Sequence, residues 1–120
     1  MSKLTVENRE DSGSGHGWSG AQTLFWNCEA ATTCHTPTGA MNWAIGIVGD
    51  QKLGSWAPKE PLGWWESRGT HVQPRSLYYK QLEDRLGSQA VLNTTTAAQR
   101  TGPVWDQLAQ WAGLSAASTK

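Results

Sequence analysis

Apolar residues in the first half of the chain fall in three short clusters, at residues 4–6, 23–27 and 42–48. The clusters are rich in β-branched and aromatic side chains, which favour strands. Residues 4–6 alternate apolar and polar positions, whereas the other two clusters are nearly continuous apolar runs, as in buried strands. The strands begin roughly twenty residues apart, a period that stacked repeats show. We therefore expect three strands side by side in the same direction, although an antiparallel meander with long loops fits the same spacing.

Turn-forming residues separate these clusters. Residues 12–20 are glycine-rich and predict a loop, because glycine loses much entropy inside a regular element. A phosphate-binding role is disfavoured there, since no Lys-Ser or Lys-Thr pair follows the glycines. Residues 32–39 contain Pro37 and Gly39 and predict a turn, and residues 51–73 show no periodicity.

The second half changes to a helical period. Residues 75–86 are predicted as a helix that follows Pro74 and ends at Gly87, because three apolar residues share one face. These residues are Tyr78, Leu82 and Leu86.

A second helix is predicted over residues 103–112, with Thr101 as its N-cap and Gly113 as its end. Residues 89–92 are predicted to be extended or irregular, and residues 94–100 to be a linker. This gives two parts, residues 1–93 and residues 94–120. The apolar stripe of the second helix consists of Val104, Leu108 and Trp111.

Charge and length limit the classes of partner. The chain has 120 residues, enough for one modest domain, and ten basic residues balance ten acidic ones. Because no basic excess exists to neutralise phosphates, we predict that nucleic acid is not a partner. A membrane partner is also not expected, since the longest apolar run is only a few residues. A secretory signal is not expected in this stretch, because no charged segment followed by an apolar one appears after Met1.

The two cysteines, Cys28 and Cys34, are separated by five residues, which is not a zinc-binding spacing. His35 is a third potential ligand beside Cys34, but the sequence has no second ligand pair that would complete a set of four. The sequence therefore predicts no metal site and no cofactor. A disulfide in a small loop and two buried thiols both stay open.

Acid–base candidates are few and none is joined to a nucleophile by a known motif. His16 and His71 have the right side chain but are expected to bond to backbone in loops. Glu66 follows two indoles, whose apolar surroundings suit a general acid, and it equally suits an ion pair with Arg68. The catalytic residues are therefore unassigned.

Tryptophan is the outlying residue type, with eight Trp against one Phe and two Tyr. Indole faces stack on the C–H patches of sugar rings, while carboxylates and arginines bond to sugar hydroxyls. Residues 51–73 combine both kinds of group, and the predicted sugar-binding residues are Trp56, Trp64, Trp65, Glu66 and Arg68. The alternative is that these rings plug the end of a small core.

Three other tryptophans are interpreted as structural. Trp43 lies within an apolar run and is expected in the core, and Trp105 and Trp111 are expected to pack the last helix.

The stretch from residue 5 to residue 92 resembles the C-terminal end of right-handed parallel β-helix proteins of the pectate-lyase-like superfamily. The blocks that carry the resemblance are residues 7–9, 15–22, 26–28, 42–46, 65–69, 74–78, 81–82 and 85–87. The resemblance implies a mainly β fold, the last coils of a β-helix solenoid, followed by one or two C-terminal helices, the helix at 75–86 closing the coils.

The resemblance also implies a fragment of a secreted, extracellular protein that acts on polysaccharide as a lyase or a hydrolase. The fragment itself is expected not to be catalytic, because the central coils and the Asp clusters of a calcium-dependent lyase are missing. An open solenoid end predicts self-association. Two alternatives are a carbohydrate-binding module without catalysis and a structural or assembly segment.

Overall fold

The computed structural model describes residues 2–12 and 19–114, which form parts of two compact units, Met1–Leu77 and Tyr78–Lys120. The predicted loop at residues 13–18, with His16, lies outside the described residues. The units divide between Leu77 and Tyr78, whereas the sequence analysis placed its boundary after residue 93.

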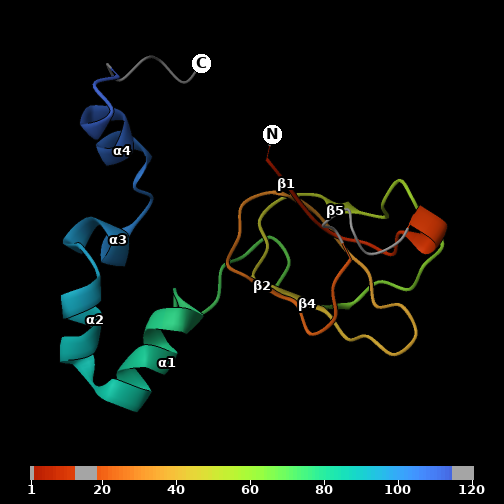
Figure 1. Ribbon diagram of the computed structural model, residues 1–120, viewed down its shortest axis with the longest axis horizontal. Helices are drawn as coiled ribbons and strands as arrows, with labels where there is room; N and C mark the ends of the chain where they lie inside the picture. Colours follow the sequence, from red (N-terminus) through yellow and green to blue (C-terminus); the bar gives the residue numbers. More distant parts are fainter. Residues whose placement is uncertain (1, 13–18, 115–120) are drawn as a thin grey trace. The chain divides into compact units, whose positions relative to one another are not determined.

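The first unit is built from two three-stranded sheets in which every neighbouring pair of strands is parallel (Figure 1). One sheet has the order β1-β3-β5 and the other β2-β4-β6. The first sheet contains β1 (Lys3–Val6), β3 (Ala31–Cys34) and β5 (Gln51–Lys52). The second contains β2 (Leu24–Trp26), β4 (Trp43–Ile45) and β6 (Trp64–Glu66).

The chain passes alternately between the two sheets, so strands that are consecutive in sequence lie in different sheets. A short 3-10 helix, η1 (Glu10–Ser12), follows β1. The path from β2 to β3 runs beside the path from β4 to β5, and an isolated parallel bridge joins Glu29 to Val48 there. The two connections therefore follow the same course, one strand apart.

Each strand of the β2-β4-β6 sheet is followed directly by a residue with left-handed backbone geometry. Asn27, Gly46 and Ser67 have φ values of 51°, 70° and 53°. The Asn27 N–H donates to Ile45 O at 2.9 Å, and the Gly46 N–H donates to Glu66 O at 3.0 Å, so the turns are stacked. A Cβ atom at Gly46 would lie 2.3 Å from Asn27 Oδ1, so only glycine fits at the middle turn.

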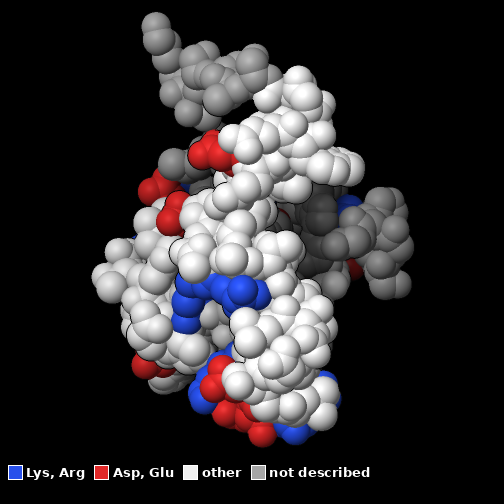
Figure 2. Space-filling view, turned by 90° about the vertical axis from the view of Figure 1, so that its left-hand side faces the viewer, with Lys and Arg blue, Asp and Glu red and all other residues white. Residues whose placement is uncertain are grey.

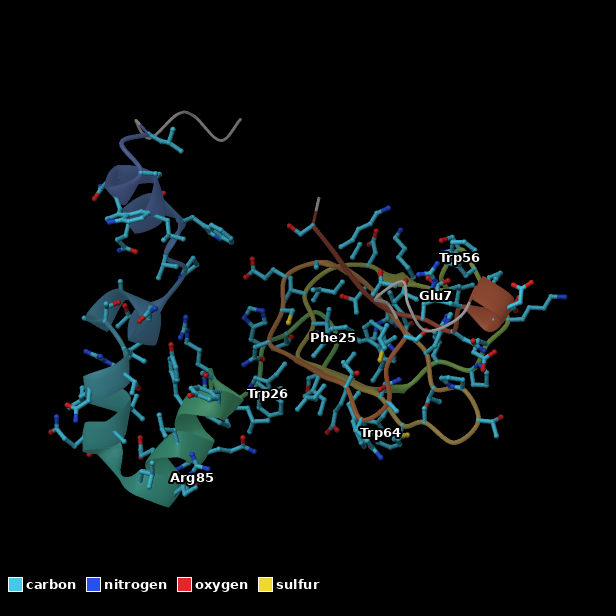
Figure 3. All side chains as sticks on the ribbon, viewed as in Figure 1. Glu7, Phe25, Trp26, Trp56, Trp64 and Arg85 are labelled. Atoms are coloured by element: carbon cyan, nitrogen blue, oxygen red, sulfur yellow. The ribbon has the colours of Figure 1, made fainter. Side chains whose placement is uncertain are left out.

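The core of the first unit lies between the two sheets. Val6, Cys34, Ala44 and Ile47 are buried and form one cluster. Phe25, Cys28 and Trp65 are partly buried and pack against this cluster. Figure 3 shows Phe25 in the interior of the unit.

Helices make up the second unit. They are α1 (Leu77–Leu86, whose first residue belongs to the first unit), α2 (Ser88–Thr94), α3 (Ala97–Thr101) and α4 (Trp105–Trp111). Gly87, with φ of 88°, separates α1 from α2. Thr96 and Gln99 form a capping box at the start of α3, because each side chain accepts a bond from the other residue's backbone N–H. No helix in the described part of the chain is long and apolar enough to cross a membrane.

The predicted β-helix solenoid is wrong. The strands do run parallel, but they are two to four residues long and form two small separate sheets, not closed coils. The stretch 4–6 pairs with β3 and not with residues 24–26, so the three predicted strands do not form one ladder; only β2 and β4 are neighbours. Helical residues also outnumber strand residues, so the fold is not mainly β.

Several local predictions also need correction. The predicted turn at 32–39 begins with strand β3, and residues 89–92 and 94–100 contribute to helices α2 and α3. Thr101 ends α3, while Val104 is the N-cap of α4. Trp105 and Trp111 are 74% and 88% exposed, because the short α4 finds no apolar partner among the described residues that covers its indoles.

Substitution of Gly46 tests the stacked turns. We expect Gly46→Ala to lower the free energy of unfolding by at least about 2 kcal/mol, because it adds the cost of a left-handed alanine to a clash with Asn27 Oδ1. The matched control is Gly39→Ala, since Gly39 has φ of 83° but nothing within 4 Å of the added Cβ. Urea unfolding measures both, and equal losses would contradict the role of the Asn27 contact.

Candidate functional site

Register determines which side chains of the β2-β4-β6 sheet face the core. Ala44 is fully buried, and its register partners are Phe25 on β2 and Trp65 on β6. Because side chains alternate along a strand, the residues before and after these three lie on the opposite side of the sheet. We call this side the outer face; it consists of Leu24, Trp26, Trp43, Ile45, Trp64 and Glu66.

One row of the outer face is aromatic and accessible. Leu24, Trp43 and Trp64 are in register across the three strands. Trp64 is 56% exposed, Leu24 is 40% exposed, and Trp43 is half-buried. The Trp64 indole Nε1 donates to Glu66 Oε2 at 3.2 Å, and this bond holds the ring and the carboxylate together on one strand.

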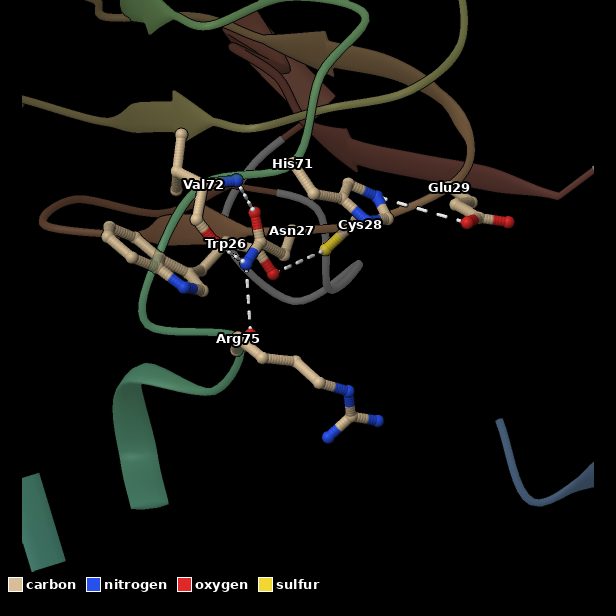
Figure 4. A network of polar contacts seen from close by, with 7 residues as sticks. All are labelled: Trp26, Asn27, Cys28, Glu29, His71, Val72 and Arg75. Atoms are coloured by element: carbon tan, nitrogen blue, oxygen red, sulfur yellow. Dashed lines mark hydrogen bonds and ion pairs between the residues drawn. The ribbon is translucent and has the colours of Figure 1, made fainter. Parts of the chain in front are cut away.

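The other row is partly covered by the segment that leaves β6. Trp26 Nε1 donates to Pro74 O at 2.9 Å. Asn27 Oδ1 accepts from Val72 N at 2.7 Å, and its Nδ2 donates to Val72 O at 2.7 Å and to Arg75 O at 3.0 Å (Figure 4). This polar network places the segment beside Trp26, so the Leu24–Trp43–Trp64 row is the more accessible part of the outer face.

The structure separates the five residues that the sequence analysis grouped. Trp64 and Glu66 lie together on the outer face, but Trp65 packs against the core from the opposite side of the same strand. The Arg68 guanidinium lies over the Trp65 ring, 5.8 Å from its centroid. Trp56 is at the other side of the first unit from Trp64 (Figure 3).

Trp56 belongs to a second polar region. Its backbone N–H donates to Glu7 Oε1 at 2.6 Å, and the Arg9 guanidinium lies 4.9 Å from its ring centroid. Glu7 is only 3% exposed. This region borders a pocket of about 290 Å³, lined by Val6, Glu7, Asn8, Ser19, Gly20, Ala21, His35, Pro37 and Asn42.

The buried polar side chains of this pocket are engaged with backbone. His35 Nδ1 accepts from Asn8 N at 3.2 Å, and its Nε2 lies 2.7 Å from Leu53 O, so the ring is the neutral Nε2–H tautomer. Asn42 accepts from Thr23 N and donates to Gly20 O and His35 O. These groups hold loops in place through bonds to backbone.

The two cysteines are free thiols in neighbouring parts of the chain. Cys34 is buried at the end of β3, and Cys28 is partly buried in the connection from β2 to β3. Burial raises the pKa of the Cys34 thiol to about 11, and it also raises the pKa of Cys28.

Several charged side chains outside these regions form exposed ion pairs. His71 Nε2 lies 3.9 Å from Glu29 Oε1 at an exposed position (Figure 4). Within residues 2–12 and 19–114, no three His, Cys, Asp or Glu side chains are arranged to hold a metal ion. On the face drawn in Figure 2, acidic and basic groups occupy small areas of a mostly uncharged surface and lie beside one another at the lower end of the view.

Comparison with known proteins gives no relative: no family model, no curated protein and no solved structure matches the chain.

Sequence analysis missed two members of the accessible row, Leu24 and Trp43. Trp43 was assigned to the core because its run looked continuously apolar. The small residue Ala44 indicates the correct face. Side chains alternate along a strand, so when the middle residue Ala44 faces the core, its neighbours Trp43 and Ile45 lie on the other face.

Adjacent tryptophans on β6 should respond differently to truncation. We expect Trp65→Ala to lower the free energy of unfolding by about 3 kcal/mol, because Trp65 packs against the core. Trp64→Ala should cost only about 0.5 kcal/mol, since Trp64 is 56% exposed. Thermal and urea unfolding compare the two, and a larger loss for Trp64→Ala would show that the faces are assigned the wrong way round.

Alkaline pH should destabilise the first unit through Cys34. An unfolded thiol ionises near its ordinary pKa of 9.0, whereas the folded thiol stays protonated until about 11. The neutral thiol therefore contributes its full stabilising effect below pH 9. As the pH rises from 9 to 11, this contribution is lost and the free energy of unfolding falls by about 3 kcal/mol.

The measurement is urea unfolding at pH 8, 9, 10 and 11 for the natural chain and for Cys34→Ala. The variant is less stable throughout but should lack this part of the pH dependence. Parallel curves for the two proteins would contradict the assignment to Cys34.

Proposed function

We propose that the chain binds polysaccharide through the outer face of the β2-β4-β6 sheet and does not itself catalyse a reaction. The observation that carries this proposal is the exposed Trp64 indole, in register with Trp43 and hydrogen-bonded to the Glu66 carboxylate. An indole face supplies apolar stacking for the C–H side of a sugar, and the carboxylate beside it accepts bonds from hydroxyl groups.

Two features support binding over catalysis. The buried Glu7, His35 and Asn42 side chains bond to backbone groups, and His71 pairs with Glu29 at the surface. The two thiols have raised pKa values, which keeps them protonated and unreactive at neutral pH. The outer face, in contrast, presents aromatic rings to solvent.

A binding assay with immobilised polysaccharides tests the proposal. Affinity electrophoresis on a panel of neutral and charged glycans should detect binding by the natural chain, and Trp64→Ala should weaken it roughly five- to tenfold, the value of one lost aromatic contact. Trp56→Ala is the matched control, since Trp56 is a similarly exposed tryptophan on the other side of the unit.

Product release from the same glycans should be absent. Equal effects of the two substitutions, or no retention by any glycan with a folded chain, would contradict the proposal.

Assembly through strand edges is a second candidate function. In the described part of the chain, β1 and β2 are each paired on one side only, at the same end of the two sheets. Exposed strand edges offer backbone groups for pairing with another copy. Sedimentation velocity over a range of concentrations separates this role from glycan binding, because assembly predicts oligomers whose formation is unaffected by Trp64→Ala.

A further inference from the structure

We infer that the preferred ligand is an uncharged, extended polysaccharide that runs across the strands of the outer face, and that acidic polysaccharides are disfavoured. This inference rests on the proposed function. It is carried by two observations, the charge of the outer face and the register of its accessible row.

The charge of the outer face is negative. Five of its six residues are apolar or aromatic, and the sixth, Glu66, is a carboxylate bonded to the Trp64 indole. Recognition of a carboxylate on a sugar requires Arg or Lys donors, with Arg favoured because its planar fork fits two oxygens.

The arginine that follows Glu66 most closely in sequence is directed to the other side of the strand. The Arg68 guanidinium lies over the ring of Trp65, which belongs to the core side of β6. A uronic acid carboxylate above Trp64 would therefore meet the like charge of Glu66.

The direction of the ligand follows from register. Leu24, Trp43 and Trp64 lie opposite one another on neighbouring strands, which are spaced by about 4.8 Å. This spacing is close to the length of one hexose in an extended chain, so successive sugars would lie over successive strands. Along the strands, in contrast, the surface is limited by Trp26, which is bonded to Pro74.

Soluble hexasaccharides test the ligand class. Isothermal titration with cellohexaose, N-acetylchitohexaose and hexagalacturonate should show binding of at least one neutral ligand, and binding of hexagalacturonate at least about fivefold weaker, from one like-charge contact at about 4 Å in water. Glu66→Gln keeps an acceptor for Trp64 Nε1 and should remove most of this difference. Natural-chain affinities alone decide the question if this variant does not fold.

Leu24→Trp tests the direction. It adds a third indole to the row and should strengthen binding of the neutral hexasaccharide several-fold, while leaving a disaccharide of the same sugar nearly unchanged. Leu24→Asp should weaken hexasaccharide binding. Unchanged affinity for both variants, with folding verified by circular dichroism, would overturn the crosswise direction.

The outcomes separate this inference from the function on which it rests. Hexagalacturonate bound as tightly as the neutral ligands overturns the inference and leaves polysaccharide binding in place. No binding of any of the three hexasaccharides, and no retention on the immobilised glycan panel, overturns both.

Discussion

Parallel pairing around Ala44 is the constraint on which the rest of the first unit depends. This small residue is fully buried between Phe25 and Trp65 on the neighbouring strands. A shift of one residue in the pairing of β6 with β4 would turn β6 over, moving Trp64 and Glu66 into the core and Trp65 into solvent. The position of the core and the chemistry of the outer face are therefore fixed by the same register.

Polar side chains maintain this register where apolar contacts are few. The core cluster is small, and several of the most deeply buried side chains are polar, among them His35, Asn42 and Thr32. His35 and Asn42 bond to backbone groups of segments distant in sequence, and Asn27 does the same for the segment after β6. Buried polar groups that are fully bonded specify one arrangement of loops, because any other arrangement leaves them without partners.

Sequence reasoning recovered elements with a clear local signal. Strands were predicted at residues 4–6, 23–27 and 42–48; the first overlaps β1, and the other two contain β2 and β4. The helix at 75–86 was found from its apolar spacing, and Gly87 does end α1. Strand β3 was missed because two threonines and a cysteine show no alternation, and their burial comes from pairing on both sides.

Errors of architecture and of site have a common cause. Which strands pair is decided by contacts far apart in sequence, so a roughly twenty-residue spacing between strands predicted parallel neighbours but not the two sheets into which they fall. Likewise, sequence placed Trp64, Trp65 and Glu66 together by proximity, whereas the pleat of β6 puts Trp65 on the opposite face. Trp56 lies near these residues in the chain but across the unit in space.

The hydrogen bonds that hold residues 72–75 bear on which parts of the sequence can change without affecting the sheet. The Trp26 and Asn27 side chains donate hydrogen bonds to the backbone oxygens of Val72, Pro74 and Arg75. The segment after β6 is therefore held against the sheet before α1 begins. These bonds lie wholly within the first unit, so we expect changes of length or sequence in the helical region after Leu77 to leave them unaltered.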